Sequence, residues 1–567
     1  MSALPASSVT AIISAKPQIH RIQNKIKGRI SMLDRRSLIL ASGAGLAAAA
    51  GCAATPQPKA QAQDLGASSV EGILNVRHFG ATGDGTTIDT PAINRAIEDA
   101  AARGGGTVYF PPGKYACFTI RLKSKVSLYL EQGAIIYAAP APPEGTSGGY
   151  DHPEPIDPSY ANYQDFGHSH WRNSLIWGEG LSDITIAGDG LIDGTNLARG
   201  DGSYNYMDDP HYNGTGNKAI ALKWCRNVLL RDFRVYRGGW FALLATGVDN
   251  MTIDNLMVDT TRDGFDIDCC RNVRVTNCHI NSPWDDGICL KSSYALGEAR
   301  ATENVMIANC YVTGNYEIGS LLDGTWKKMP PSFAPQVHGR IKFGTESNGG
   351  YKNITITNCT FEDSQGFALE TVDGGDLEDV TISNCTMRGN YSSPIFLRLG
   401  RRMRGPKDAA IAKFRRILIC NIVSSSSAPL LPSIIAGIPG HPVEDVKIAD
   451  CYFHQEGGAP EDLVNRVPPL EELGYPEPNM FGDLPATGFY IRDAKNVEMS
   501  NIEVAVAKAD PRAAFWLQDV EGADFFRLRV PGGAPSFHLT NVSSFRNFGS
   551  LSAPERQIES VKSTTIF

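Results

Sequence analysis

Positive charge is scarce in this sequence. The formal net charge is -8 at pH 7, with 53 lysine and arginine residues against 61 aspartate and glutamate residues. Proteins that bind nucleic acid through its phosphates need clustered lysine and arginine, so nucleic acid is not an expected partner. A polyanionic substrate is compatible with this charge, because the local charge at a site can oppose the global one.

Sequence patterns for metal and phosphate binding are also missing. The 12 cysteines are not accompanied by a second cysteine or histidine at the spacing of a zinc site. The glycine-rich turn at residues 80–85 lacks the Gly-Lys-Ser/Thr ending of a phosphate-binding loop. We therefore expect no metal and no cofactor.

The most apolar stretch near the N-terminus, Ser37 to Ala50, is too short to span a membrane as a helix. Asp34-Arg35-Arg36 precedes it, and this order of charged and apolar residues is typical of an export signal. The paired arginines resemble a twin-arginine signal. We predict that residues 1–62 are an export signal and linker, and that residues 63–567 form one catalytic domain of an exported bacterial protein.

Two processing routes remain open for this segment. Ala49-Ala50-Gly51-Cys52 resembles a lipoprotein box, in which Cys52 would carry a lipid anchor. The alternative is simple cleavage after Ala60-Gln61-Ala62. The predicted locations are accordingly the periplasm, the outer membrane as a lipoprotein, or the medium.

A six-residue phrase recurs along the chain: aspartate or asparagine at both ends, with apolar residues at the second and fourth positions. Successive copies from Asn227 to Asp379 are 23, 22, 32, 49 and 26 residues apart. The short intervals match one coil of a parallel β-helix, and 49 residues is close to two coils. We therefore predict an all-β, single-stranded parallel β-helix. Clear copies begin at Asn250, Asn272, Asn304, Asn353, Asp379 and Asp445, and weaker ones at Asp183, Asn227 and Asn496.

Cysteines share one position of this repeat, six residues after the phrase begins. The same register in successive coils would stack them as neighbours about 4.8 Å apart. We predict that they pack as small apolar side chains and form few or no disulfides. They are Cys278, Cys310, Cys359, Cys385 and Cys451.

A helix is predicted before the first coils. Thr90 is its expected N-cap and Pro91 its first helical residue, and the glycines at 104–106 end it. A solenoid exposes apolar side chains and unpaired strand edges at its open end, which such a helix can cover. The fold prediction therefore includes an N-terminal capping helix.

Three segments rich in proline, glycine or polar residues interrupt the coil pattern: 139–164, 196–217 and 460–486. Long loops on a rigid solenoid commonly form the walls of a cleft. Their aromatic residues and others nearby suit contact with carbohydrate, although aromatic side chains more often simply pack. These aromatic residues are Tyr204, Tyr206, Tyr212, Trp240 and Trp326.

Three carboxylates lie next to predicted strands and about one coil apart. Asp263 precedes the strand 265–268, and Asp285 and Asp286 follow the strand 273–278. One coil of separation would stack them on the same face. Repulsion between neighbouring carboxylates can raise the pKa of one of them and keep it protonated, as general acid catalysis requires. The alternative role, holding turns between coils, is expected for most other aspartates of the chain.

The order of four motifs resembles glycoside hydrolase family 28, the polygalacturonases and rhamnogalacturonan hydrolases. The motifs are residues 76–115, Asp263-Gly264-Phe265-Asp266, the segment 285–291 and Arg340-Ile341-Lys342. The resemblance extends from Ile73 to the C-terminus. It implies a right-handed parallel β-helix, an inverting hydrolysis of α-linked galacturonic acid in pectin, and a pectic polysaccharide or oligogalacturonide as the substrate. A β-helix of this type needs no partner to complete its core, so we expect a monomer.

The resemblance also implies roles for residues. Asp285 would be the general acid, and Asp263 and Asp286 would hold and activate water, with the carboxyl groups roughly 6.5–9.5 Å apart. Arg340 and Lys342, two positions apart on a strand, would face the same side and recognise a uronate carboxylate. Further candidates, expected to hold turns or line the cleft, are Asp266, Asp268, Trp284, Lys291, Glu346 and Glu370.

Two departures from the family pattern bear on the substrate. Thr261-Arg262-Asp263 stands where the family usually has Asn-Thr-Asp, which adds a positive charge near the expected subsites, so Arg262 is a candidate substrate-binding residue. The usual Gly-His-Gly before Ile318-Gly319-Ser320 is replaced by residues 313–317, without histidine. His338 is equally compatible with replacing that histidine and with an ordinary surface position.

Two other functions fit the same pattern. A polysaccharide lyase would use an arginine or lysine base and a Ca²⁺ held by the acidic cluster. A non-catalytic β-helix would bind a glycan without cleaving it. Unsaturated, chelator-sensitive products would identify the lyase, and binding without cleavage would identify the glycan-binding protein.

Overall fold

The computed structural model describes residues 72–143, 146–198 and 214–567, which belong to the compact unit Ser68–Phe567. The predicted export signal with Cys52, and the tyrosines 204, 206 and 212, lie outside the described residues. Among the residues described, no helix has the length and apolar character needed to cross a membrane.

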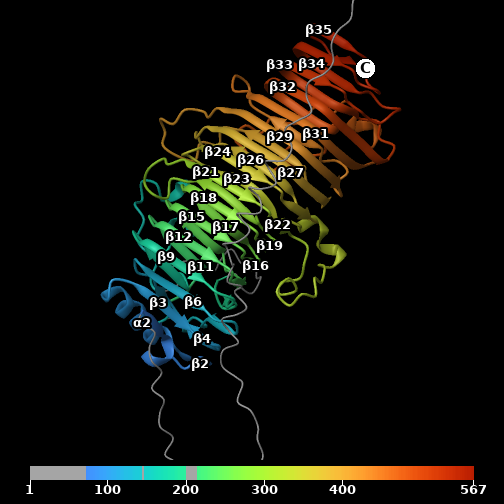
Figure 1. Cartoon of the computed structure of the whole chain (residues 1–567). Helices are drawn as coiled ribbons and strands as arrows, with labels where there is room; N and C mark the ends of the chain where they lie inside the picture. Colours follow the sequence, from blue (N-terminus) through green and yellow to red (C-terminus); the bar gives the residue numbers. More distant parts are fainter. Residues whose placement is uncertain (1–71, 144–145, 199–213) are drawn as a thin grey trace, which may run out of the picture. The chain divides into compact units, whose positions relative to one another are not determined.

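The described chain is a parallel β-helix whose coils follow one another in sequence order from the end with α2 to the C-terminal strands (Figure 1). Each strand pairs in parallel with the corresponding strand of the next coil, so that three ladders run along the helix. The ladder that carries the site, called the site sheet below, is numbered β5, β8, β11, β14, β17, β20, β23, β26, β28 and β30. Its strands span Ile120–Arg121, Ile176–Glu179, Lys218–Lys223, Phe241–Thr246, Asp263–Asp268, Ile288–Ser292, Arg340–Ser347, Gly366–Thr371, Ile395–Leu399 and Ser433–Ala436.

The other two ladders complete each coil. One contains β1 (Ile73–Asn75), β3 (Gly106–Phe110), β6 (Val126–Leu130), β9 (Ser182–Ala187), β12 (Arg226–Arg231), β15 (Asp249–Asp254), β18 (Arg271–Thr276), β21 (Thr302–Ala308) and β24 (Tyr351–Thr357). The other contains β2 (Asp84–Ile88), β4 (Gly113–Cys117), β7 (Ala134–Ala138), β10 (Leu191–Asp193), β13 (Arg234–Tyr236), β16 (Met257–Asp259), β19 (His279–Asn281), β22 (Tyr311–Thr313) and β25 (Thr360–Glu362).

Towards the C-terminus the strands lengthen and run through the corners between ladders. These are β27 (Leu377–Asn390), β29 (Phe414–Ser426), β31 (Val443–Gly457), β32 (Ala486–Lys508), β33 (Ala513–Phe526) and β34 (Phe537–Phe548). The antiparallel strands β35 (Arg556–Val561) and β36 (Thr565–Ile566) pair with β34 and cover part of its edge. The short 3-10 helices are η1 (Val76–Phe79), η2 (Ala161–Tyr163), η3 (Phe166–Ser169), η4 (Pro331–Gln336), η5 (Glu461–Leu463) and η6 (Pro478–Phe481).

The asparagines of the repeated phrase form the corners of the coils. Asn272 and Asn277 both have φ of 58°, in the left-handed region that asparagine tolerates better than most residues. The predicted strand 273–278 is therefore displaced: β18 ends before Asn277, whose conformation turns the chain. The side chains also form a ladder, since Asn272 Nδ2 donates to Asn250 Oδ1 at 3.2 Å and Asn250 Nδ2 donates to Asn227 Oδ1 at 3.1 Å. The interpretation of the 49-residue interval as almost two coils was wrong, because β21 pairs directly with β24 and Asn353 Nδ2 donates to Asn304 Oδ1 at 2.8 Å.

The repeated cysteines lie inside this solenoid. Cys278, Cys310, Cys359, Cys385 and Cys451 are each at most 3% exposed and belong to the continuous apolar core. Among the described residues every cysteine is a free thiol, and only Cys420 is not fully buried. The ladder therefore packs as small apolar side chains.

The capping helix α2 spans Thr90–Ala102 and buries Ala92, Ile93, Ala96, Ile97 and Ala100. The prediction that Thr90 is the N-cap of this helix was wrong. Thr90 is the first residue of the helix, and the N-cap is Asp89. The Asp89 carboxylate instead accepts hydrogen bonds from the backbone of Thr82 and Gly83 and fixes the glycine-rich turn. Thr90 Oγ1 accepts from the Phe118 amide at 2.7 Å, so both side chains hold the cap in place.

Two of the predicted loop excursions pack beside the site sheet. The first lies between β7 and β8 and brings η3 against β17. The second, residues 458–485 between β31 and β32, is called the C-terminal excursion below. Its Phe481 and Leu484 are fully buried in an apolar cluster with Phe396 and Tyr490. This packing makes the excursion a fixed part of the fold.

Candidate active site

Adjacent strands of the site sheet bring the predicted catalytic residues together. Asp263 begins β17, Asp285 and Asp286 lie in the turn before β20, and Arg340 begins β23. The Gly264 amide donates to the Asp286 carbonyl at 3.0 Å, and the Gly287 amide donates to the Arg340 carbonyl at 3.0 Å. Carboxylate oxygens of the three aspartates all lie within 4.8 Å of one another. This cluster is called the acidic triad below.

The glycines of the two Asp-Gly motifs permit this approach. A Cβ atom at Gly264 would lie 2.3 Å from the Gly287 carbonyl oxygen, closer than any real contact of that kind. A Cβ at Gly287 would lie 2.7 Å from a Val312 methyl group. The glycines therefore explain the residue pattern around the triad: they let neighbouring coils pack closely where the aspartates must meet.

The carboxyl groups of the triad lie at a separation that both types of glycosidase use. An oxygen-to-oxygen distance understates the separation of two carboxyl groups, because each oxygen lies about 1.2 Å from its carbon. Oxygens within 4.8 Å therefore fit the spacing of retaining enzymes as well as that of inverting ones.

Arg262 holds the most exposed member of the triad. Its Nε and a terminal nitrogen donate to Asp285 Oδ2 at 2.9 and 2.6 Å, and its guanidinium lies 5.2 Å from the Trp240 ring centroid. The Asp285 side chain is 24% exposed, against 5% for Asp263 and 3% for Asp286. Asp285 is therefore the carboxylate that an incoming substrate can reach most easily.

Electrostatics separates the members of the triad. Burial, with the nearby charges of Asp285 and Asp266, holds the pKa of Asp263 well above its usual range, although Arg262 opposes this. Burial also opposes the ionisation of Asp285. The positive charges of Arg262, His338 and Lys342 outweigh it and hold the pKa of that carboxyl below its usual range. The surroundings therefore favour the protonated form of Asp263 and the ionised form of Asp285.

Arg340 and Lys342 both reach Asp286 of the triad from β23, and both are almost completely buried. Arg340 Nε donates to Asp286 Oδ1 at 2.5 Å. Its two terminal nitrogens donate to the two Glu477 oxygens at 2.7 and 2.5 Å. Lys342 Nζ lies 3.5 Å from Asp286 Oδ2, 3.7 Å from Glu477 Oε1 and 3.8 Å from Glu370 Oε2.

Two further side chains complete this charged group. Lys342 Nζ lies 3.5 Å from Tyr475 Oη, and Tyr475 is 54% exposed beside it. Burial raises the pKa of Glu370 to about 8, against the charges of Lys342 and Arg340. At Glu477 burial also raises the pKa, but the positive charges of Arg340 and Lys342 have the larger effect and lower it to about 2. The surroundings therefore favour the ionised form of Glu477 and the neutral form of Glu370.

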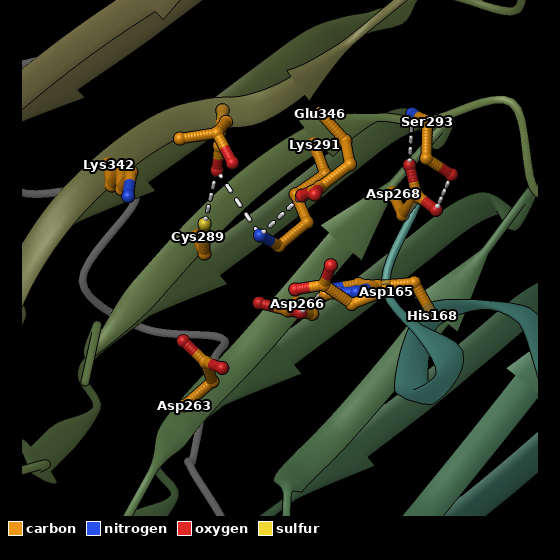
Figure 2. Close-up of polar contacts among 12 residues, drawn as sticks. Asp165, His168, Asp263, Asp266, Asp268, Cys289, Lys291, Ser293, Lys342 and Glu346 are labelled. Carbon is orange, nitrogen blue, oxygen red and sulfur yellow. Dashed lines mark hydrogen bonds and ion pairs between the residues drawn. The ribbon is translucent and has the colours of Figure 1, made fainter. Parts of the chain in front are cut away.

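A second polar network continues along the site sheet (Figure 2). His168 of η3 lies over β17, with Nε2 3.0 Å from Asp266 Oδ2. Lys291 Nζ donates to Glu346 Oε2 at 3.0 Å, and Ser293 donates to Asp268 from its amide and its hydroxyl. Figure 2 shows Asp266, Asp268, Lys291 and Glu346 on the same face of the sheet as Asp263 of the triad.

Asp165, His168 and Glu346 also come within the distances of a metal cluster. Glu346 is already paired with the cations Lys291 and Arg404, and Asp165 with Arg404. These positive charges compensate the carboxylates, which makes the group an ion-pair network.

Residues 313–317, which replace the Gly-His-Gly of the family pattern, lie against the backbone of His338. A Cβ at Gly314 would lie 2.4 Å from the His338 carbonyl oxygen, so the glycine makes room for the backbone of His338. His338 is half-buried, and its Nδ1 lies 2.9 Å from the Gln336 carbonyl oxygen. Its charge lowers the pKa of both Asp285 and Glu477. His338 is thus next to Gly339, whose amide donates to the Asp285 carbonyl at 2.9 Å, so it lies beside the triad.

Several residues of the site were not predicted from the sequence. Glu477 and Tyr475 belong to the C-terminal excursion, and Glu477 is separated from Arg340 by 137 residues. His168 belongs to the first excursion. None of them lies in a repeat or a motif, so no spacing signalled them. Trp284, a candidate from the sequence, packs edge-on against Phe333 at 5.2 Å between ring centroids.

Comparisons with known proteins agree with the fold and with the resemblance to polygalacturonases. Family models match residues 218–404 as a right-handed β-helix region and residues 73–130 as "Rhamnogalacturonase A/epimerase, pectate lyase-like". A probable polygalacturonase of Vitis vinifera is 24% identical over 304 residues, 50% of this chain and 60% of that protein. An exo-poly-alpha-D-galacturonosidase of Dickeya chrysanthemi is 23% identical over 329 residues, 51% of this chain and 50% of that protein. The alignments thus span only half to three fifths of these relatives' lengths.

Among solved structures, a family 28 exopolygalacturonase of Yersinia enterocolitica superposes with a TM-score of 0.57. It is 18% identical, and the match covers 80% of this chain and 78% of that one. Together these findings define the chain as an all-β, right-handed parallel β-helix protein. Within that class it is similar to the polygalacturonases of glycoside hydrolase family 28, which confirms the resemblance carried by the four motifs.

Proposed function

We propose that this protein is a glycoside hydrolase that cleaves α-linked galacturonic acid bonds in pectin by an inverting mechanism. The observation that carries the proposal is the acidic triad: three aspartates from neighbouring coils with oxygens within 4.8 Å of one another. Glycoside hydrolysis needs two such carboxyl groups, one to protonate the leaving oxygen and one to activate water or attack the sugar. The similarity to polygalacturonases supports the choice of pectin.

The exposures of the triad support the roles implied by the resemblance. Asp285, the most accessible member, is the proposed general acid. Asp286, which accepts from Arg340, and Asp263 are proposed to hold and activate the water. Arg262 disfavours protonation of Asp285, so we expect an acidic pH optimum. The raised pKa of Asp263 makes it the alternative proton donor.

The charges around the triad favour hydrolysis over a calcium-dependent lyase reaction. Arg262 and Arg340 donate directly to triad oxygens, and Lys342 lies 3.5 Å from one of them. These cations offset the negative charge that would attract Ca²⁺. They also contact the carboxylate oxygens that would have to coordinate the ion. A lyase therefore remains the outcome to be tested, and the hydrolase is the proposal.

Product analysis tests this function. The protein would be incubated with polygalacturonate, with methyl-esterified pectin and with rhamnogalacturonan, each with and without a chelator, and compared with Asp285→Asn. New reducing ends without ultraviolet absorbance, lost in the variant, are expected. Unsaturated products that disappear with the chelator would replace the proposal by a lyase. Binding without any cleavage would replace it by a glycan-binding function.

A further inference from the structure

The two cations expected to recognise a uronate carboxylate are already occupied. Arg340 is 2% exposed and uses Nε for Asp286 and both terminal nitrogens for Glu477. Lys342 is 3% exposed and lies within 4 Å of Asp286, Glu370 and Glu477. Neither side chain presents a free positive charge to a ligand.

Glu477 takes the place that a uronate would take. A bidentate carboxylate on the fork of an arginine is the geometry by which proteins recognise carboxylate ligands. Here the chain supplies that carboxylate itself, with oxygens 2.7 and 2.5 Å from the Arg340 nitrogens. The Glu477 side chain is still 24% exposed, so a ligand at this position would meet its negative charge.

The segment that carries Glu477 is anchored on both sides. Arg398 donates to the carbonyl oxygens of Leu470 and Glu471 at 3.0 and 2.9 Å. After Glu477 the chain enters η6, where Phe481 is fully buried. These contacts therefore hold the segment with Glu477 in place beside Arg340.

We infer that the subsite beside Glu477 accepts a galacturonosyl unit without a free carboxylate, that is, a methyl-esterified one. This inference rests on the proposed pectin hydrolysis and specifies its substrate. A free uronate would lie against Glu477 and Asp286, and like charges in a partly buried site repel each other strongly. A methyl ester carries no charge, and the exposed ring of Tyr475 beside Lys342 offers it an apolar surface.

The test compares two substrates that differ only in this group: an oligogalacturonide and its methyl ester. The parent protein is expected to have the higher kcat/KM for the ester. In Glu477→Gln the like charge is gone, so the ratio of ester to free acid should fall by about tenfold or more. The ratio, and not the rate alone, is the readout, because loss of a structural contact would reduce both rates together.

Glu472→Gln is the matched control. Glu472 lies in the same excursion, pairs with Arg401, and its side chain is 23% exposed. In this variant the ratio of kcat/KM for the ester to kcat/KM for the free acid should equal that of the parent protein. A parent that prefers the free acid, or a Glu477→Gln variant with an unchanged ratio, would overturn the inference while leaving the hydrolase proposal standing.

Binding separates this inference from the failure of the proposed function. If neither oligosaccharide is cleaved, calorimetry can still measure the affinity of the subsite for galacturonate and for its methyl ester. Weak binding of galacturonate that strengthens in Glu477→Gln, with little change for the ester, supports the inference. Equal binding of both ligands by both proteins contradicts it. Thermal unfolding of each variant shows whether the fold is intact.

Discussion

Arg262 binds Asp285 across one coil of the β-helix, 23 residues further along the chain, through two nitrogen donors at 2.9 and 2.6 Å. The positive charge of Arg262 favours the ionised form of Asp285, the most exposed carboxylate of the triad. Arg262 is also the residue by which Thr261-Arg262-Asp263 departs from the Asn-Thr-Asp pattern of the family that the motifs resemble.

Replacing Arg262 by threonine should therefore move the pH profile of kcat/KM. The pKa of Asp285 is lowered mainly by this arginine, so it must rise when the charge is removed. If Asp285 is the general acid, it stays protonated to higher pH, and the alkaline limb of the profile shifts upward.

The limb that moves identifies the role. A shift of the acidic limb instead would show that Asp285 works ionised, which would transfer the acid role to Asp263. Arg262→Lys keeps the positive charge without the two-donor geometry and is the control, with a profile expected to lie closer to that of the parent.

Single replacements in the triad should abolish most activity. Asp263→Asn, Asp285→Asn and Asp286→Asn each remove a carboxylate from proton transfer or water activation, for which losses of roughly 10²- to 10⁴-fold in kcat are usual. Reducing-end assays measure the effect. Asp445→Asn is the control, because Asp445 occupies the corner position that asparagine fills in other coils and accepts from Asn496 at 3.0 Å.

The stereochemistry of cleavage tests the inverting mechanism directly. Hydrolysis of an α-linkage with inversion gives the β-anomer as the first product. Nuclear magnetic resonance of the fresh product, recorded before mutarotation, measures this. Initial formation of the α-anomer would mean retention, and one triad aspartate would then have to act as the nucleophile.

Glu370 should make the stability of the fold fall as pH rises. Its pKa is raised from the ordinary 4.5 to about 8 by burial, so the folded state holds a proton that the unfolded state releases between these values. Where the folded state binds more protons, the free energy of unfolding decreases with increasing pH.

Glu370→Gln stays neutral at every pH and should remove this decrease, so that the variant gains stability relative to the parent at pH 8 but not at pH 4. Denaturant unfolding at several pH values measures the effect. Glu559→Gln, on the exposed surface of β35, is the control and should follow the parent. Parallel curves for Glu370→Gln and the parent would contradict the prediction.

The corner asparagines should be sensitive to side-chain type. Asn272 has φ of 58°, a conformation that costs most residues about 1–2 kcal/mol. Asn272→Ala should lower the free energy of unfolding by about that amount, plus the loss of its hydrogen bonds to the neighbouring coils. Asn272→Gly loses the same hydrogen bonds but tolerates the conformation, so it should be the milder variant.

Much of the fold followed from local chemistry. The β-helix was predictable because the Asx phrase repeats at coil length, and each copy encodes its own corner. The meeting of Asp263 with Asp285 and Asp286 was predictable for the same reason, since residues one coil apart must be neighbours.

The charge state of the site was not predictable in this way. Glu477 comes from a segment without repeats, and its partner Arg340 lies 137 residues away. Arg262 was visible as an unusual residue, but its choice of Asp285 as partner depends on side-chain geometry. Sequence spacing predicts contacts along the ladders and has no information on where an excursion folds back.

The asparagine ladder has a consequence for how such proteins diversify. Neighbouring rungs are joined by similar hydrogen bonds whether 22 residues separate them, as between Asn250 and Asn272, or 49, as between Asn304 and Asn353. The length of chain between two corners is thus free, while the corners themselves are fixed. Segments such as the one carrying Glu477 can therefore be lengthened, exchanged or remodelled, giving new specificities on an unchanged scaffold.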